Sequence, residues 1–178
     1  MMGKTKAKQA IFHLIKAQEL FDDLGWGDLS NYARGKECYL AHRLGHRVGK
    51  MGGGPDAVDN NGDTCEYKST TLSGYLPSGE LKSHTWNFNG MSYFPTWKQQ
   101  KEWLCEHMKE IKGGNYFAIF ERGKIVSAWR VESDDLLPIM IKKLHKKYPK
   151  LPYSKDPRPG VSITLNIVKE LGSKLNIT

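Results

Sequence analysis

The chain has 178 residues, enough for one domain with a hydrophobic core of its own. Lys and Arg outnumber Asp and Glu by 27 to 19, which gives a formal net charge of +8. This excess suits a polyanion, above all nucleic acid, although a charge spread evenly over the surface would serve only solubility. The three cysteines are widely spaced and form no CxxC pair, so the pattern excludes a disulfide framework and a Cys-rich zinc site.

The first 20 residues contain no signal-peptide core, and no apolar run in the sequence approaches the ~20 residues that a membrane span requires, so we expect a protein outside the membrane. The cysteine pattern favours a reducing cytoplasm. Apolar residues at helical spacing, with Ile11, Leu14 and Ile15 at their centre, predict an amphipathic helix over about residues 5 to 23. Its apolar face needs a partner surface. A second helix is expected from about Tyr32 to Leu44, capped by Ser30 or Asn31 and stopped by Gly45.

Further along, "PDAVD" (55–59) and "TCEYKST" (64–70) predict two strands around a turn. Thr96 and Gln99 form a capping box for a helix that ends before Gly113. "NYFAIF" and "IVSAWRV" flank "ERGK" and predict a hairpin, and Ser133 is expected to cap the helix that follows. A proline-rich connector at 147–160 and a strand "VSITLNIV" complete the order, which predicts one α/β domain with a mixed β-sheet flanked by helices.

The stretch around the first turn collects charged side chains. Alternation along a strand places Glu66 and Lys68 on one face, about 7 Å apart. If Asn61 and Gly62 alone form the loop, Asp56 lies opposite Tyr67 and faces away from Glu66. If Asn60 joins them and Gly62 is left-handed, Asp59 pairs with Asp63 and Asp56 falls opposite Glu66, and a glycine at the third loop position favours this second register.

Two carboxylates that converge at roughly 5 Å repel each other unless a cation lies between them, and Mg²⁺ is the hard cation that prefers such oxygen ligands. Asp56, Glu66 and the backbone carbonyl of Tyr67 are the predicted ligands. Lys68 would place positive charge beside a phosphate or orient an attacking water, which suits phosphodiester hydrolysis. Glu37, on the preceding helix, would be a further ligand or a solvated charge. An Asp followed by Glu-x-Lys also occurs often by chance.

The stretch "GPDAVDNNGDTCEYKS" resembles the metal site of the PD-(D/E)xK nuclease superfamily, with Asp56, Glu66 and Lys68 in its three signature roles. Within that superfamily it is similar to type II restriction endonucleases, and "FAIFERGKIVSAWRVESDDL" and "SKDPRPG" extend the similarity more weakly. The resemblance implies a restriction-endonuclease-like core and a homodimer that embraces double-stranded DNA. It also implies Mg²⁺-dependent cleavage that leaves 5′-phosphates, and a cognate DNA methyltransferase as genetic partner.

The same resemblance suggests a division of the single domain into a helical dimerisation segment (1–30), a catalytic core (31–146) and a DNA-contacting segment (147–178). The residues expected to contact DNA are Lys82, Ser83, His84, Asn87, Asn89 and Arg158. Because the family member that this stretch resembles reads bases partly through a run of three histidines, of which only His84 is kept, the recognition sequence should differ. Two rivals remain: a junction-resolving or repair nuclease of the same superfamily, and a basic DNA-binding protein without catalytic activity.

Overall fold

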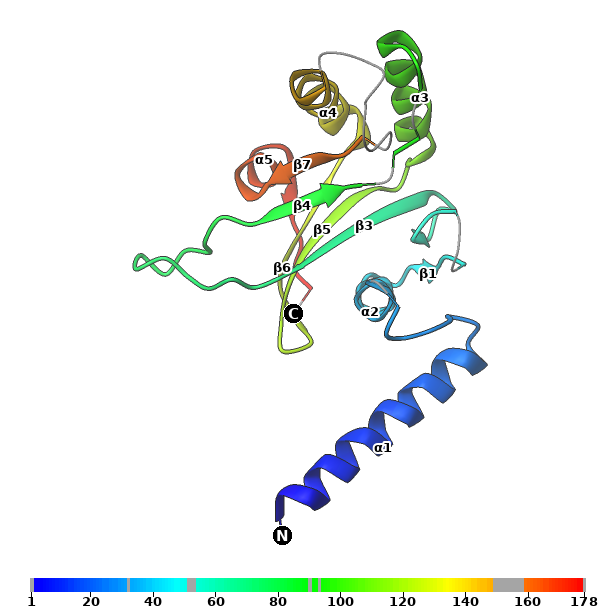
Figure 1. The fold of residues 1–178 in the computed structure, drawn as a ribbon, viewed down its shortest axis with the longest axis vertical. Coiled ribbons are helices and arrows are strands. Elements are labelled where there is room, and N and C mark those ends of the chain that lie inside the picture. Colours follow the sequence, from blue (N-terminus) through cyan, green and yellow to red (C-terminus); the bar gives the residue numbers. More distant parts are fainter. Residues whose placement is uncertain are drawn as a thin grey trace.

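The computed structural model describes residues 2–31, 33–50, 54–89, 91–92, 94–148 and 159–177. It is a mixed α/β fold in which helices flank a six-stranded sheet of order β1-β2-β3-β5-β6-β8 (Figure 1). The strands are β1 (Arg47–Val48), β2 (Ala57–Val58), β3 (Thr64–Thr71), β4 (Thr85–Phe88), β5 (Gly114–Glu121), β6 (Lys124–Val131), β7 (Val161–Thr164) and β8 (Ser173–Lys174). The helices are α1 (Met2–Asp23), α2 (Arg34–Leu44), α3 (Trp97–Glu110), α4 (Ser133–Lys147) and α5 (Leu165–Leu171).

The six-stranded sheet is mostly antiparallel. Only β3 and β5 run parallel, with Glu66 opposite Asn115 and Lys68 opposite Phe117. Strands β4 and β7 form a separate antiparallel ribbon. Since paired residues of neighbouring strands share a face, the side chains of Glu66 and Lys68 lie on the same face as Phe117.

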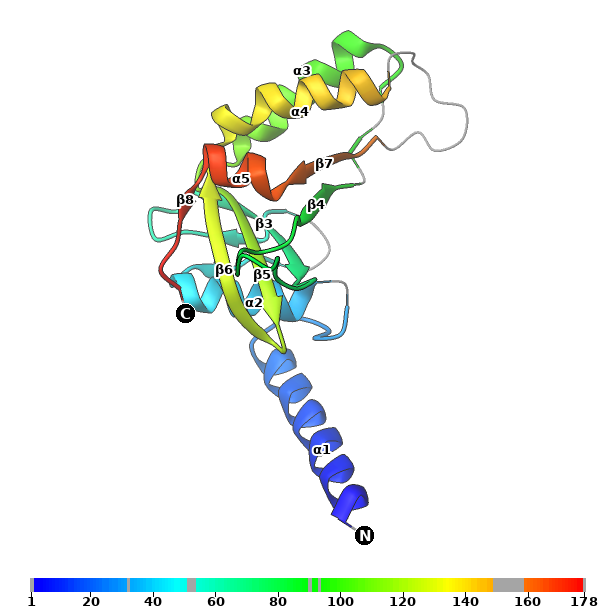
Figure 2. The same ribbon diagram turned by 90° about the vertical axis from the view of Figure 1, so that its left-hand side faces the viewer.

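Each face of the sheet has its own core. The larger core joins Phe117 and Trp129 to apolar side chains of α3, α4, α5 and the β4–β7 ribbon. The smaller core joins Tyr67, Tyr116 and Ala118 to α2 and to the C-terminal residues. Figure 2 shows α3 and α4 side by side at one end, with α2 across the sheet from them. On β3, the face that carries Tyr67 is therefore buried in the smaller core, whereas Glu66 and Lys68 lie on the other face and are only partly buried.

Several expected helix ends are confirmed. Gly45 follows α2 in the left-handed conformation, with φ of 71°. The Thr96 Oγ1 atom accepts a hydrogen bond from the Gln99 N–H at 3.3 Å, which is the predicted cap of α3. The hairpin of β5 and β6 turns at Arg122 and Gly123, both at positive φ, within the predicted "ERGK".

Three local predictions are wrong. Helix α2 begins at Arg34 with Ala33 before it, so neither Ser30 nor Asn31 caps it. Ser133 is the first residue of α4 rather than its cap. "VSITLNIV" is a strand only to Thr164, after which the chain turns into α5.

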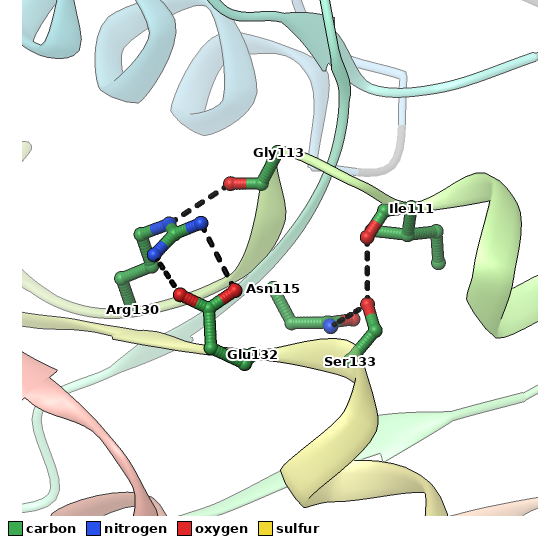
Figure 3. Close-up of polar contacts among 6 residues, drawn as sticks. All are labelled: Ile111, Gly113, Asn115, Arg130, Glu132 and Ser133. Atoms are coloured by element: carbon green, nitrogen blue, oxygen red, sulfur yellow. Dashed lines mark hydrogen bonds and ion pairs between the residues drawn. The ribbon is translucent and has the colours of Figure 1, made fainter.

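Ser133 instead joins a buried polar network between α3, β5 and α4 (Figure 3). Its Oγ donates to the Ile111 carbonyl at 2.7 Å and accepts from Asn115 Nδ2 at 3.0 Å. Beside it, Arg130 donates to the Gly113 carbonyl and to both oxygens of Glu132. These bonds fix the start of β5, the strand on which β3 is aligned.

Two segments project from this body (Figure 1). Helix α1 extends away from the sheet, and residues 72–83 form an arm between β3 and β4, closed by a Tyr75–Leu81 bridge. Most of the predicted connector at 147–160 lies outside the described residues. None of the described helices combines the length and apolar character needed to cross a bilayer.

Candidate active site

The β2–β3 hairpin has the register in which Asp56 lies opposite Glu66. Ala57 pairs with Cys65 and Val58 with Thr64, and the Asp59 N–H donates to the Asp63 carbonyl at 2.9 Å. The loop is therefore Asn60-Asn61-Gly62, with Gly62 left-handed at φ of 88°. The Asp59 carboxylate accepts from the N–H groups of Asn61 and Asp63, both at 2.9 Å, which braces the loop. Of the two registers left open by the sequence, this is the second.

Asp56 is held directly against β3. Its Oδ2 accepts a hydrogen bond from the Tyr67 N–H at 2.7 Å. The Asp56 carbonyl accepts from the Gly49 N–H at 2.8 Å, and a Cβ at Gly49 would lie 1.9 Å from the Pro55 carbonyl oxygen. Only glycine fits at position 49, where the backbone is in close contact with Pro55 and Asp56.

The pKa of Asp56 is raised by its surroundings. Burial is the main cause that raises its pKa to about 7, and the negative charges of Glu66 and Glu37 act in the same direction. The ammonium of Lys68 and the Tyr67 N–H act against them. Strand β3 and helix α2 thus bring two further carboxylates and one lysine into electrostatic range of Asp56.

Glu66 and Lys68 form an ion pair on the face of β3 that also carries the large core. Their side chains are 20% and 22% exposed, so the pair is only partly solvated. The Lys68 Nζ also lies 5.0 Å from the centroid of the Phe88 ring, on β4. Lys68 therefore has an anionic partner on its own strand and an aromatic partner on another.

Glu37 reaches this region from α2 and is 19% exposed. Its carboxylate lies 3.5 Å from Arg34 Nη1. Arg34 is buried and also donates to the carbonyls of Trp26 (2.7 Å) and Gly49 (2.6 Å). The structure thus brings Glu37 into electrostatic range of Asp56 but gives it an arginine partner, so it is not a freely solvated charge.

Tyr67 contributes its backbone to the site and its ring to the opposite face of the sheet. The ring is buried, and its hydroxyl lies 2.8 Å from His46 Nδ1. The rings of His46 and Tyr116 also meet edge to face, with centroids 5.3 Å apart. These contacts fix the peptide that holds Asp56, whereas the role of the Tyr67 carbonyl as a metal ligand stays a prediction.

The donors on this face are oxygens. Within the described ranges, no cluster of three or more His, Cys, Asp and Glu side chains is close enough to hold a metal ion. Asp56 and Glu66 offer two carboxylates, and a cation that they held would need backbone, water or substrate oxygens for the rest of its shell. This donor set fits Mg²⁺, which keeps several waters and uses few protein ligands.

The residues predicted to contact DNA differ in position. Lys82 and Ser83 are exposed at the base of the arm. His84 is 4% exposed; its Nε2 accepts from the Ser73 N–H at 3.1 Å, and its Nδ1 donates to the Lys82 carbonyl at 2.5 Å. Both ring nitrogens of His84 are thus used to hold the two sides of the arm together, and we do not retain it as a base-reading residue.

Asn87 and Asn89 are exposed at the β4–β7 ribbon. Asn87 lies opposite Ser162, whose hydroxyl donates to Asn87 Oδ1 at 2.6 Å. Both asparagines are exposed to solvent, and their contact with DNA stays a prediction. Arg158 lies outside the described residues.

Two residues of this site, Phe88 and Arg34, were not predicted from the sequence. Phe88 alternates with the two asparagines, which predicts burial but does not reveal that its ring faces Lys68. Arg34 lies three positions before Glu37, the helical spacing of an ion pair, and this signal was available.

In comparisons with known proteins, no family model matches this chain, and no curated protein sequence is significantly similar to it.

Proposed function

We propose that this protein is a type II restriction endonuclease that hydrolyses phosphodiester bonds of double-stranded DNA with Mg²⁺ and leaves 5′-phosphates. The hairpin register carries the proposal, because it places Asp56 opposite Glu66 with Lys68 on the same strand face. The mixed sheet flanked by helices is compatible with a restriction-endonuclease-like core. The net charge of +8 favours a polyanionic substrate.

Asp56 and Glu66, with the Tyr67 carbonyl, would hold the ion. The raised pKa of Asp56 supports this assignment, since a cation is what the converging carboxylates lack. When bound, Mg²⁺ neutralises charge on the scissile phosphate and makes a coordinated water a better nucleophile.

Lys68 supplies a cation that belongs to the chain itself. Its ammonium lies beside the Glu66 carboxylate on the strand face where a phosphate would meet the two acids. A partly desolvated ammonium stabilises negative charge on a phosphate more strongly than a fully solvated one, because the local dielectric is lower. Glu37 keeps negative potential at the site and orients Arg34.

The partners follow from the surfaces of the fold. Lys82, Ser83, Asn87 and Asn89 are exposed and available to a duplex, and asparagine side chains suit adenine edges in the major groove. The exposed apolar side chains of α1 suit the interface of a homodimer, which would present one site to each DNA strand. We further propose a cytoplasmic location and a cognate DNA methyltransferase, without which the host DNA would be cut.

The test is incubation of the purified chain with supercoiled plasmid and Mg²⁺. Discrete linear fragments are expected, with no cutting in EDTA. Lys68→Ala should lower the cleavage rate at least about 100-fold, the loss typical of a group that stabilises transition-state charge, yet retain plasmid binding in Ca²⁺. Lys124→Ala, a matched change at the exposed turn of β5 and β6, should cut normally.

Other outcomes separate the rivals. A smear would indicate a nuclease without sequence specificity, and cleavage confined to branched DNA would indicate a junction-resolving or repair enzyme. Retardation of plasmid without cleavage would leave only a DNA-binding protein. Normal cutting by Lys68→Ala would show that the site has been assigned to the wrong residues.

A further inference from the structure

Lys68 is held from outside its own strand. The centroid of the Phe88 ring lies 5.0 Å from Lys68 Nζ, within the distance at which an ammonium is attracted to an aromatic face. Phe88 is 7% exposed and belongs to the large core, where its ring centroid is 6.1 Å from that of Phe117. Phe117 in turn lies opposite Lys68 in the β3–β5 ladder. The ring that faces the ammonium is therefore fixed by core packing.

The two contacts of Lys68 are not equivalent. Its ion pair uses Glu66 Oε1, an oxygen of one of the two carboxylates available to a cation. A lysine side chain has several rotatable bonds, so an ammonium that lost this partner would sample many positions. The contact with Phe88 uses no oxygen of the site, and it remains available when Glu66 is engaged elsewhere.

Phe88 lies on the strand that also carries an exposed candidate for DNA contact. In β4, Trp86 and Phe88 point into the core, while Thr85 and Asn87 are exposed. Asn87 is bonded across the ribbon to Ser162, and Phe88 pairs with Val161 of the same ribbon. A displacement of β4 therefore moves the Asn87 surface and the Phe88 ring together.

We propose that Phe88 is a positioning residue for the Lys68 ammonium, so that the β4–β7 ribbon, as well as β3, determines where this cation lies. The effect of Phe88 on catalysis rests on the proposed nuclease function, because only in a nuclease would the position of the Lys68 ammonium affect cleavage. The contact itself can be tested without any cleavage.

The test is NMR of the chain after reductive ¹³C-methylation of its lysines. An ammonium over a ring face is shielded by the ring current, so the dimethyl signal of Lys68 should be displaced upfield; Lys68→Arg identifies it by its absence. Phe88→Leu should return this signal to the position of exposed lysines, and Phe88→Tyr should preserve it. A Lys68 signal at the exposed-lysine position in the unsubstituted chain would overturn the proposal, even if Phe88→Leu does not fold.

A matched control lies on the other face of the sheet. Lys36 Nζ is 5.6 Å from the ring centroid of Phe120, which is also a buried ring of a central strand. Phe120→Leu should displace the Lys36 signal and leave the Lys68 signal in place. Movement of both signals in both variants would mean that loosening of the core, and not the ring contact, produces the effect.

Cleavage of plasmid tests the functional consequence. Phe88→Leu should lower kcat about tenfold, the factor that corresponds to loss of one partly desolvated cation–ring contact, with plasmid binding in Ca²⁺ unchanged. Phe88→Tyr and Phe120→Leu should cut at the normal rate. Normal cutting by Phe88→Leu would overturn the positioning role, whereas a chain that never cuts plasmid but keeps the shifted Lys68 signal would refute the nuclease function alone.

Discussion

Asp56 combines two properties that conflict in the absence of a cation. It accepts a hydrogen bond from the Tyr67 N–H at 2.7 Å, which favours its charged form, yet burial and two neighbouring carboxylates raise its pKa to about 7. A folded chain therefore binds a proton at Asp56 that an unfolded chain releases near its ordinary value of 3.8. Between these two values, rising pH removes stability, because the folded form binds more protons there.

This loss of stability with rising pH can be measured with Asp56→Asn, which keeps an oxygen acceptor for the Tyr67 N–H and removes the charge. Below pH 3.8, the ordinary pKa of Asp, the two proteins should have similar free energies of unfolding. By about pH 7.5 in EDTA, the free energy of unfolding of the variant should be the larger one. The difference should be at most roughly 1.4 kcal/mol for each unit by which the pKa of Asp56 is raised. Urea denaturation at about pH 4.5 and about pH 7.5 provides the measurement. A difference that shrinks as pH rises would contradict the environment described for Asp56.

The sequence predicted those features of the site that depend only on the spacing of residues along one strand. The alternation of Glu66 and Lys68, and their distance from Asp56 through a three-residue loop, are local properties that the printed sequence contains. The packing of β4 on β3 is not local, so the ring beside Lys68 could not be predicted. For the same reason His84, placed by its neighbours in the sequence among DNA contacts, proved to be a buried brace of the arm.

Among the elements, the β2–β3 loop has the strongest effect on the site. Because side chains alternate along a strand, a one-residue change of register would turn Asp56 to the other face of the hairpin. The observed loop needs a left-handed residue at its third position, which Gly62 supplies at φ of 88°. The strand β2 has only two residues, so the loop and the Asp59 carboxylate, more than the ladder, hold this register.

Gly62→Ala is the corresponding test. A Cβ there meets nothing within 4 Å, so its effect is conformational alone, about 1–2 kcal/mol for a left-handed residue. Gly123→Ala in the β5–β6 turn is matched, with φ of 79° and equally open space. Both should lower the urea midpoint by similar amounts, but only Gly62→Ala should weaken Mg²⁺-dependent plasmid cleavage several-fold. Equal cleavage by both variants would mean that the loop does not control the site.

Element types were predicted best where the local signal was strong. Thr96 and Gln99 marked the start of α3, and "ERGK" marked the hairpin of β5 and β6. The β-branched run after Val161 misled because tertiary packing overrides propensity: Leu165 and Val168 are buried from a helix, not from a strand. Ser133 misled because its hydroxyl found partners in Ile111 and Asn115 instead of in its own helix.

For the whole molecule, α1 is the feature that the monomer leaves unexplained. Helix α1 and Leu24, the residue after it, expose more than half of each of six apolar residues: Ile11, Phe12, Leu14, Ile15, Leu20 and Leu24. The contacts between this helix and the loop that follows come from its C-terminal half, through Gln18 with Gly27 and Leu29 and through Phe21 with Trp26. An apolar surface of this extent on a projecting helix indicates association, and a second copy of the chain is the partner we propose.

Light scattering after size-exclusion chromatography tests this. Leu14→Glu places a charge in the apolar stripe and should convert a dimer into a monomer, with cleavage of plasmid reduced to nicking of one strand. Gln9→Glu introduces the same residue on the side of the helix away from the stripe of Ile11, Leu14 and Ile15, by its 3.6-residue period, and should remain dimeric. A wild-type chain that is monomeric throughout the micromolar range would contradict the assigned role of α1.

The single parallel pairing in the sheet has a bearing on how the protein is made. Most of β3 is aligned only on β5, which lies far along the chain beyond the arm and α3, while its other neighbour is the two-residue β2. A ribosome-bound chain that ends before β5 has only a short hairpin around Asp56 and Glu66, and such hairpins are marginally stable in water. The acidic residues and Lys68 therefore reach their final arrangement only after β5 has been synthesised. For the nuclease that we propose, an unfinished polypeptide would then lack the assembled site and would not damage the DNA of the cell that is synthesising it.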